Sequence, residues 1–131
     1  MMNIDSLNNQ LKATDDRLNQ VFKALKDIYL IDSTPAPLVV TQELGYDIKA
    51  YTHLYNSIEF VIGKLTALVD VLDSKGFTNI DGTQLTGVSP IWPANEIGLD
   101  SLNDGYQEII SDLQQATNKV VQAAKINGLS I

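Results

Sequence analysis

The sequence contains no cysteine and only one arginine, one histidine and one tryptophan among its 131 residues. The lack of cysteine excludes disulfide bonds, thiolate catalysis and Cys-ligated zinc. The single histidine, His53, is expected to be a surface residue on the solvent side of a helix, so we expect neither a zinc site nor a histidine-based triad. No glycine-rich phosphate loop or nucleophile elbow occurs. The sequence therefore predicts a protein that is not an enzyme and that uses no cofactor or metal.

Positive charge is also scarce, since 16 Asp and Glu outnumber 9 Lys and Arg and leave a net charge of −7. An acidic domain of this kind repels nucleic acid and anionic membrane surfaces, so neither is expected as a partner. No apolar run approaches the roughly 18 residues of a membrane span, and no basic-then-apolar signal segment begins the chain. We expect a soluble chain without a signal peptide, forming a single domain over residues 1–131.

Apolar residues at alternating steps of three and four mark three long segments and predict an all-α fold with coiled-coil character. The first segment carries its seam on Ile4, Leu7, Leu11, Thr14, Leu18, Val21, Leu25 and Ile28. The second carries it on Ile48, Tyr51, Tyr55, Ile58, Ile62, Leu65, Val69 and Leu72, beside a second apolar stripe of Leu54, Val61 and Leu68. The third carries it on Leu99, Leu102, Tyr106, Ile109, Leu113, Ala116, Val120 and Ala123.

Capping residues and prolines place these helices at about 3–31, 42–74 and 97–126. The simplest topology for three helices of similar length is an up-down-up bundle. In the long second connection, two short alternating segments flank the Asp-Gly pair at 81–82, which predicts a small β-hairpin over about 77–86.

Six residues are candidates for contact with a partner. Ile91 and Trp92 either close the open end of the bundle or anchor a neighbouring molecule. The hairpin, which carries Phe77 and Ile80, either spans the bundle end or offers an edge strand for pairing. Phe22 and Tyr29 lie on a flank of the first helix, outside its seam, where copies of the chain could meet.

A helical rod without catalytic residues is most simply a non-catalytic structural or assembly protein. The sequence favours a homo-oligomer or a component of a larger symmetric complex, with protein partners or copies of itself as its contacts. In a competing arrangement, helices from several copies share one coiled coil. Small size, ten Asn, eight Gln and one Arg suggest a bacteriophage virion protein of the neck, tail, baseplate or capsid surface. The alternative is a small helical binding or regulatory module, such as a secretion chaperone or adaptor.

Overall fold

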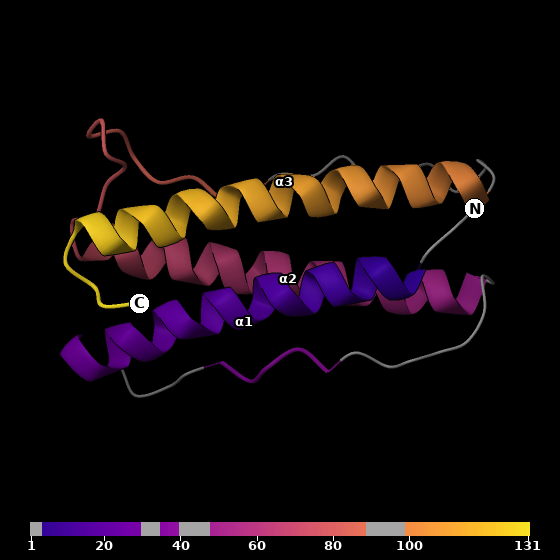
Figure 1. The fold of residues 1–131 in the computed structure, drawn as a ribbon, viewed down its shortest axis with the longest axis horizontal. Helices are drawn as coiled ribbons and strands as arrows, with labels where there is room; N and C mark the ends of the chain where they lie inside the picture. Colours follow the sequence, from indigo (N-terminus) through magenta and orange to yellow (C-terminus); the bar gives the residue numbers. More distant parts are fainter. Residues whose placement is uncertain (1–3, 30–34, 40–47, 89–98) are drawn as a thin grey trace.

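The computed structural model describes residues 4–29, 35–39, 48–88 and 99–131. These residues form three helices, α1 (Ile4–Tyr29), α2 (Ile48–Ser74) and α3 (Leu99–Ile126), which pack along their lengths into one elongated bundle (Figure 1). The prediction of an all-α bundle is confirmed for this part of the chain. The residues predicted to extend the helices, at 3, 30–31, 42–47 and 97–98, lie outside the described ranges.

All three helices run in the same direction, as their colours show in Figure 1. The contacts between side chains follow the same order. Gln10, early in α1, exchanges hydrogen bonds with Gln107, early in α3, and Arg17, further along, donates one to Asn118. The rings of Tyr51 and Tyr106, each early in its helix, lie 5.8 Å apart. The predicted up-down-up topology is therefore wrong.

The physical reason is the length of the connections. Short loops force consecutive helices to lie antiparallel, whereas a parallel neighbour needs a connection that returns along the bundle. A helix of 26 residues is about 39 Å long. The roughly 18 residues between α1 and α2 reach about 60 Å when extended, so the chain has ample length to begin α2 beside the start of α1.

Burial shows which faces meet in the core. In α1 the seam residues from Ile4 to Leu25 are buried, but Ile28 is 53% exposed. In α2 the side chains of Leu54, Val61 and Leu68 are fully buried, while Tyr55, Ile62 and Val69 are only partly buried. At every second position of the predicted seam of α2, the residue that is fully buried is therefore the one immediately before the predicted residue. Because both stripes are apolar, only the neighbouring helices decide which one is enclosed.

The predicted β-hairpin is also wrong, because residues 77–86 form a turn but no strand. The backbone N–H of Phe77 donates to the Leu72 carbonyl at 3.0 Å, within the end of α2. The side-chain amide of Asn79 donates to the Gln84 carbonyl at 3.2 Å. Since these groups bond elsewhere, they are not available for a strand ladder, and only the turn around Gly82 is formed.

Candidate interaction surface at the C-terminal end of the bundle

Two helices end at the same end of the bundle in the same capping motif. After α2, Gly76 adopts a φ of 81°, and the N–H groups of Gly76 and Phe77 donate to the carbonyls of Asp73 and Leu72. After α3, Gly128 adopts a φ of 104°, and Leu129 N–H donates to the Ala124 carbonyl at 2.9 Å. These are Schellman motifs, in which glycine supplies the left-handed residue and the next side chain packs back on the helix.

The apolar residues that follow the two glycines are both buried, Phe77 with 4% and Leu129 with 5% of its surface exposed. They close the core beneath the end of the bundle. The side chain of Asn127 adds a hydrogen bond of 3.2 Å to the Thr78 carbonyl, which joins the end of α3 to the segment after α2. The backbone at this end is therefore held by caps, buried anchors and a cross-link between elements.

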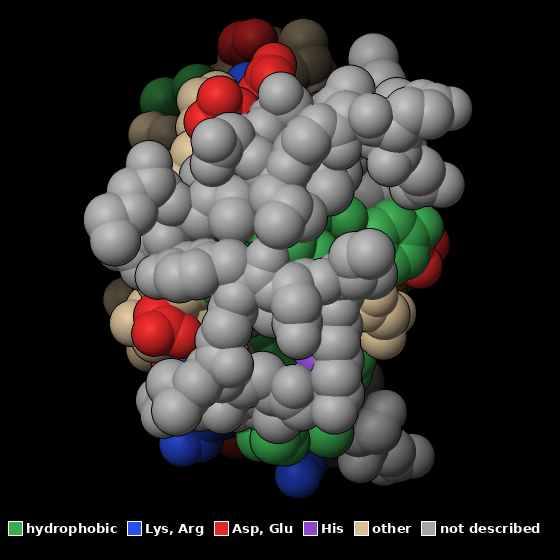
Figure 2. Space-filling model, turned by 90° about the vertical axis from the view of Figure 1, so that its right-hand side faces the viewer, with side chains coloured by type: hydrophobic (Ala, Val, Ile, Leu, Met, Phe, Trp, Pro, Cys, Tyr) green, Lys and Arg blue, Asp and Glu red, His purple; other side chains and the backbone are tan. Residues whose placement is uncertain are grey.

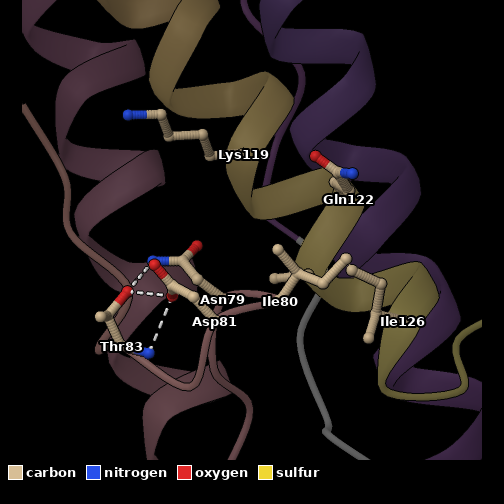
Figure 3. Close-up of a pocket in the computed structure, with 8 residues that line it drawn as sticks. Asn79, Ile80, Asp81, Thr83, Lys119, Gln122 and Ile126 are labelled. Carbon is tan, nitrogen blue, oxygen red and sulfur yellow. Dashed lines mark hydrogen bonds between the residues drawn. The ribbon is translucent and has the colours of Figure 1, made fainter.

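The turn beyond Thr78 is closed by its own hydrogen bonds (Figure 3). Gly82 N–H donates to the Asn79 carbonyl at 2.9 Å, and Asn79 N–H donates to the Thr83 carbonyl at 3.0 Å. The Asp81 carboxylate accepts bonds from the hydroxyl and the backbone N–H of Thr83, at 2.6 and 3.0 Å. These bonds stabilise the ionised carboxylate and lower the pKa of Asp81 below its ordinary value of 3.8.

Four of the large hydrophobic side chains exposed in the described residues are isoleucines of this end. Ile80 at the turn is 77% exposed, Ile28 near the end of α1 is 53%, Ile126 at the end of α3 is 49%, and Ile131 is 39%. Ile80 and Ile126 line a pocket of about 320 Å³ between the turn and α3, and Figure 3 shows them on adjoining sides of it. We call Ile80 and Ile126 the isoleucine patch.

Exposed lysines accompany the isoleucine patch. Lys26 lies in the last turn of α1 and Lys125 in the last turn of α3. Lys75 follows the last residue of α2, and Lys119 lines the pocket beside Ile80. Lysines near the end of a helix interact favourably with the negative end of its dipole. Asp27, Asp73 and Asp81 are exposed at the same end. The C-terminal end of the bundle thus combines apolar side chains with charges of both signs.

Of the six predicted partner-binding residues, one is strongly exposed in this surface. Ile80 lies at the tip of the turn, whereas Phe77 is buried beneath it. Phe22 is only 5% exposed and belongs to the core of the single chain, so its expected place on an exposed flank is wrong. Tyr29 is the last residue of α1, but its side chain lies outside the description, as do Ile91 and Trp92.

A second pocket, of about 410 Å³, lies beside the first half of α2. Its apolar lining includes Val39, which is 81% exposed, and Phe60, which is 42% exposed. Its polar lining includes His53, Asn56 and Asn8. This pocket joins α1, α2 and the described piece of the connection between them, residues 35–39.

A buried ion pair holds that connecting piece in place, and sequence reasoning missed it. The side chain of Asp15 is fully buried, and Lys64 Nζ lies 2.5 Å from its Oδ1. The other carboxylate oxygen accepts the Leu38 N–H at 2.8 Å, and Lys64 Nζ donates to the Ala36 carbonyl at 2.8 Å. No sequence signal reveals this pair, because its partners come from three separate segments.

Two tyrosines early in the bundle have raised pKa values. Burial and the neighbouring Tyr55 raise the pKa of Tyr106 above 10.0. A hydrogen bond to Glu59 and, to a lesser extent, desolvation raise the pKa of Tyr55. Among the described residues, no three His, Asp or Glu side chains converge as metal ligands would. None of the helices in the described ranges has the length and apolar character that crossing a bilayer requires.

Comparison with protein-family models, with curated proteins and with solved structures finds no match for this chain.

Proposed function

We propose that this chain is a non-catalytic structural protein that joins a larger symmetric assembly through the C-terminal end of its bundle. The observation that carries the proposal is the isoleucine patch, in which the exposed Ile80 of the turn and the exposed Ile126 at the end of α3 line one pocket. Single exposed apolar residues are ordinary on a protein surface, but apolar residues gathered at one place mark interaction sites.

The local backbone supports a docking role. The turn that carries Ile80 is closed by hydrogen bonds, and the end of α3 that carries Ile126 is capped at Gly128. A surface held in one conformation before binding loses little conformational entropy when a partner arrives. The exposed lysines and aspartates around it oppose non-specific apolar aggregation.

A bacteriophage virion, in its neck, tail, baseplate or capsid surface, is our concrete hypothesis for the assembly. Its support is compositional: a small chain with ten Asn, eight Gln and one Arg. The elongated bundle in Figure 1 suits a building block that is repeated around an axis. Mass spectrometry of purified particles from the source of the sequence tests this hypothesis, which is abandoned if the chain is missing from them.

A photocrosslinking amino acid placed at residue 80 tests the docking proposal in the native source. We expect it to link the chain to a defined protein of the assembly, and we expect Ile80→Asp to shift the chain from a large complex to the elution volume of a single chain. The matched control is Val39→Asp, which adds the same charge at a site that is 81% exposed beside the first half of α2. If the native complex forms equally well with Ile80→Asp and with Val39→Asp, the proposal is wrong.

The second candidate function is a small helical binding module that takes a partner segment beside α2. The pocket lined by Val39 and Phe60 is the observation that favours it, because apolar side chains with a few polar neighbours form typical peptide-binding grooves. Phe60→Ser should then weaken titratable binding of a peptide to the isolated chain, while Ile80→Asp leaves that binding unchanged. If Ile80→Asp weakens the binding and Phe60→Ser leaves it unchanged, the result favours docking through the C-terminal end of the bundle.

A further inference from the structure

The pocket beside the first half of α2 contains a buried amide that lacks a bonding partner. Asn8 of α1 lines this pocket and is only 8% exposed. Within the described part of the chain, its side chain makes no hydrogen bond. A carboxamide has two donor hydrogens and an acceptor oxygen, and buried polar groups are almost always hydrogen-bonded. The Asn8 amide therefore indicates a bonding partner that enters the pocket from outside the chain.

The lining of the pocket indicates the chemistry of that partner. The described part of the lining includes no Asp, Glu, Lys or Arg, although such side chains are visible on several sides of the molecule in Figure 2. Pro37, Val39 and Phe60 supply apolar contact, and the volume of about 410 Å³ lies in the range of ligand pockets. A net charge of −7 disfavours nucleic acid at such a surface. The pocket therefore suits an uncharged partner with an apolar side chain.

The buried pair of Asp15 and Lys64 holds one wall of this pocket in place. Asp15 lies two helical turns after Asn8 on the same face of α1. The pair bonds the Leu38 N–H and the Ala36 carbonyl, so the connecting piece that lines the pocket is fixed against the helices. An apolar pair of similar volume often packs helices equally well, but it cannot bond these two backbone groups. The position of the connecting piece therefore explains why the pair is charged.

We propose that this pocket binds an extended, uncharged peptide segment of a partner protein, and that Asn8 recognises the peptide backbone. The inference rests on the second candidate function and names the chemistry of its partner. In an extended chain, the N–H and C=O of one residue point to the same side. The Asn8 oxygen accepts that N–H, and the Asn8 amide group donates to that C=O. Asp15 and Lys64 are positioning residues, which act through the connecting piece.

Peptides from a displayed random library are the probe for this site. They are selected for binding to the unmodified full chain and against binding to Phe60→Ser, and calorimetry measures their affinity. We expect Asn8→Leu to weaken binding at least about tenfold, because it removes two hydrogen bonds to the peptide backbone. The matched control is Asn9→Leu, which makes the same change at the exposed neighbouring residue and should leave the affinity unchanged.

The melting temperature of the free chain separates recognition from a structural role. Asn8→Leu replaces a buried amide by an apolar side chain of higher helix propensity, so the melting temperature should be unchanged or raised. A lower melting temperature together with an unchanged affinity would show that Asn8 serves the fold alone. NMR of the unmodified chain adds a measurement that needs no variant. The side-chain amide protons of Asn8 should exchange with solvent more slowly when peptide is bound, and unchanged exchange contradicts the proposed bonds.

A spin label tests the positioning role of the buried pair. The label is attached to Val39→Cys in a chain that contains no other cysteine, and its spectrum reports the motion of the connecting piece. Asp15→Leu with Lys64→Met should free the label and, in the unlabelled chain, weaken peptide binding at least about tenfold, while circular dichroism shows that the helices are kept. Asp15→Asn with Lys64→Gln keeps an acceptor for Leu38 and a donor for Ala36, so it should restore both properties. If the Leu and Met variant binds peptide as tightly as the unmodified chain, the positioning role is wrong.

The outcomes separate this inference from the function on which it rests. If a selected peptide loses affinity in Phe60→Ser but not in Asn8→Leu, the second candidate function stands, water alone serves the Asn8 amide, and the inference is wrong. If no selected peptide depends on Phe60, the second candidate function is wrong and the inference fails with it.

Discussion

Asp15 and Lys64 are charged side chains enclosed in a bundle whose core is otherwise mostly apolar. Burial of two charges is unfavourable unless they pair closely and their remaining bonding groups find partners. Here the Leu38 N–H and the Ala36 carbonyl complete the set, and Lys64 Nζ also lies 4.9 Å from the centre of the Phe60 ring. The pair therefore selects one position for residues 36–38 against α1 and α2.

Removal of one partner should be costly. Lys64→Met leaves the Asp15 carboxylate buried without its cation, and we expect the free energy of unfolding to fall by about 3–5 kcal/mol in urea denaturation. The control is Lys12→Met, which breaks the exposed pair of Lys12 and Asp16 at 3.1 Å and should change stability by less than about 1 kcal/mol. Equal losses in the two variants would show that the buried pair is not specifically required.

The turn that carries Ile80 should depend on pH through Asp81. Because the folded state lowers the pKa of Asp81, the carboxylate contributes stability above its ordinary pKa of 3.8 and loses this contribution as the pH falls through the lower folded value. Titration of the Asp81 carboxyl carbon by NMR should give a midpoint below 3.8. In Thr83→Val, which removes the hydroxyl donor, the midpoint should move upward. An unchanged midpoint in Thr83→Val contradicts this assignment.

The helices differ in how fully their sequences specify them. Glycines past the last apolar residue predicted the ends of α2 and α3, and Gly76 and Gly128 do adopt positive φ in Schellman motifs. The predicted hairpin is wrong because the signal for a hairpin and the signal for the end of α2 fall on the same residues. An Asp-Gly pair between alternating residues favours a hairpin, but the cap of α2 takes the Phe77 N–H and the core takes the Phe77 side chain.

Two glycine substitutions in and after α2 should have opposite effects. Gly76→Ala places a side chain at a φ of 81°, which costs about 1 kcal/mol because L residues rarely adopt that conformation. Gly63 lies within α2, and a Cβ there meets no atom within 4 Å, so Gly63→Ala should add about 0.5–1 kcal/mol through helix propensity. Thermal unfolding measures both changes, and a loss of stability in Gly63→Ala would contradict the second expectation.

At the scale of the whole molecule, the parallel arrangement of the helices determines which surfaces exist. It gathers three helix starts at one end and three helix ends at the other (Figure 1), together with the charges that each helix carries near its termini. The isoleucine patch is a consequence of the same arrangement, since Ile80 follows the end of α2 and Ile126 ends α3. An antiparallel α2 and α3 would have separated them by the length of the bundle.

Paired spin labels test the parallel arrangement directly, because a chain without cysteine accepts cysteines at chosen sites. Labels at Asp5 and Asp104, both exposed near the starts of α1 and α3, should lie close together. Labels at Asp5 and Lys125 should lie much further apart, because 104 and 125 are separated by about 32 Å along α3. Pulsed electron resonance measures both distances, and the reverse order would restore the antiparallel topology.

The sequence by itself determined where helices form and where two of them end, because these properties depend on the spacing of neighbouring residues and on glycine at fixed positions. Ile80 was proposed as a contact because it belonged to the predicted hairpin, and its role as a contact stays a prediction. The direction of the helices, the enclosed stripe of α2, the buried pair of Asp15 and Lys64, and the burial of Phe22 were decided only by the tertiary structure. Each of these depends on which segments, distant in sequence, lie side by side, and a local pattern contains no information about that choice.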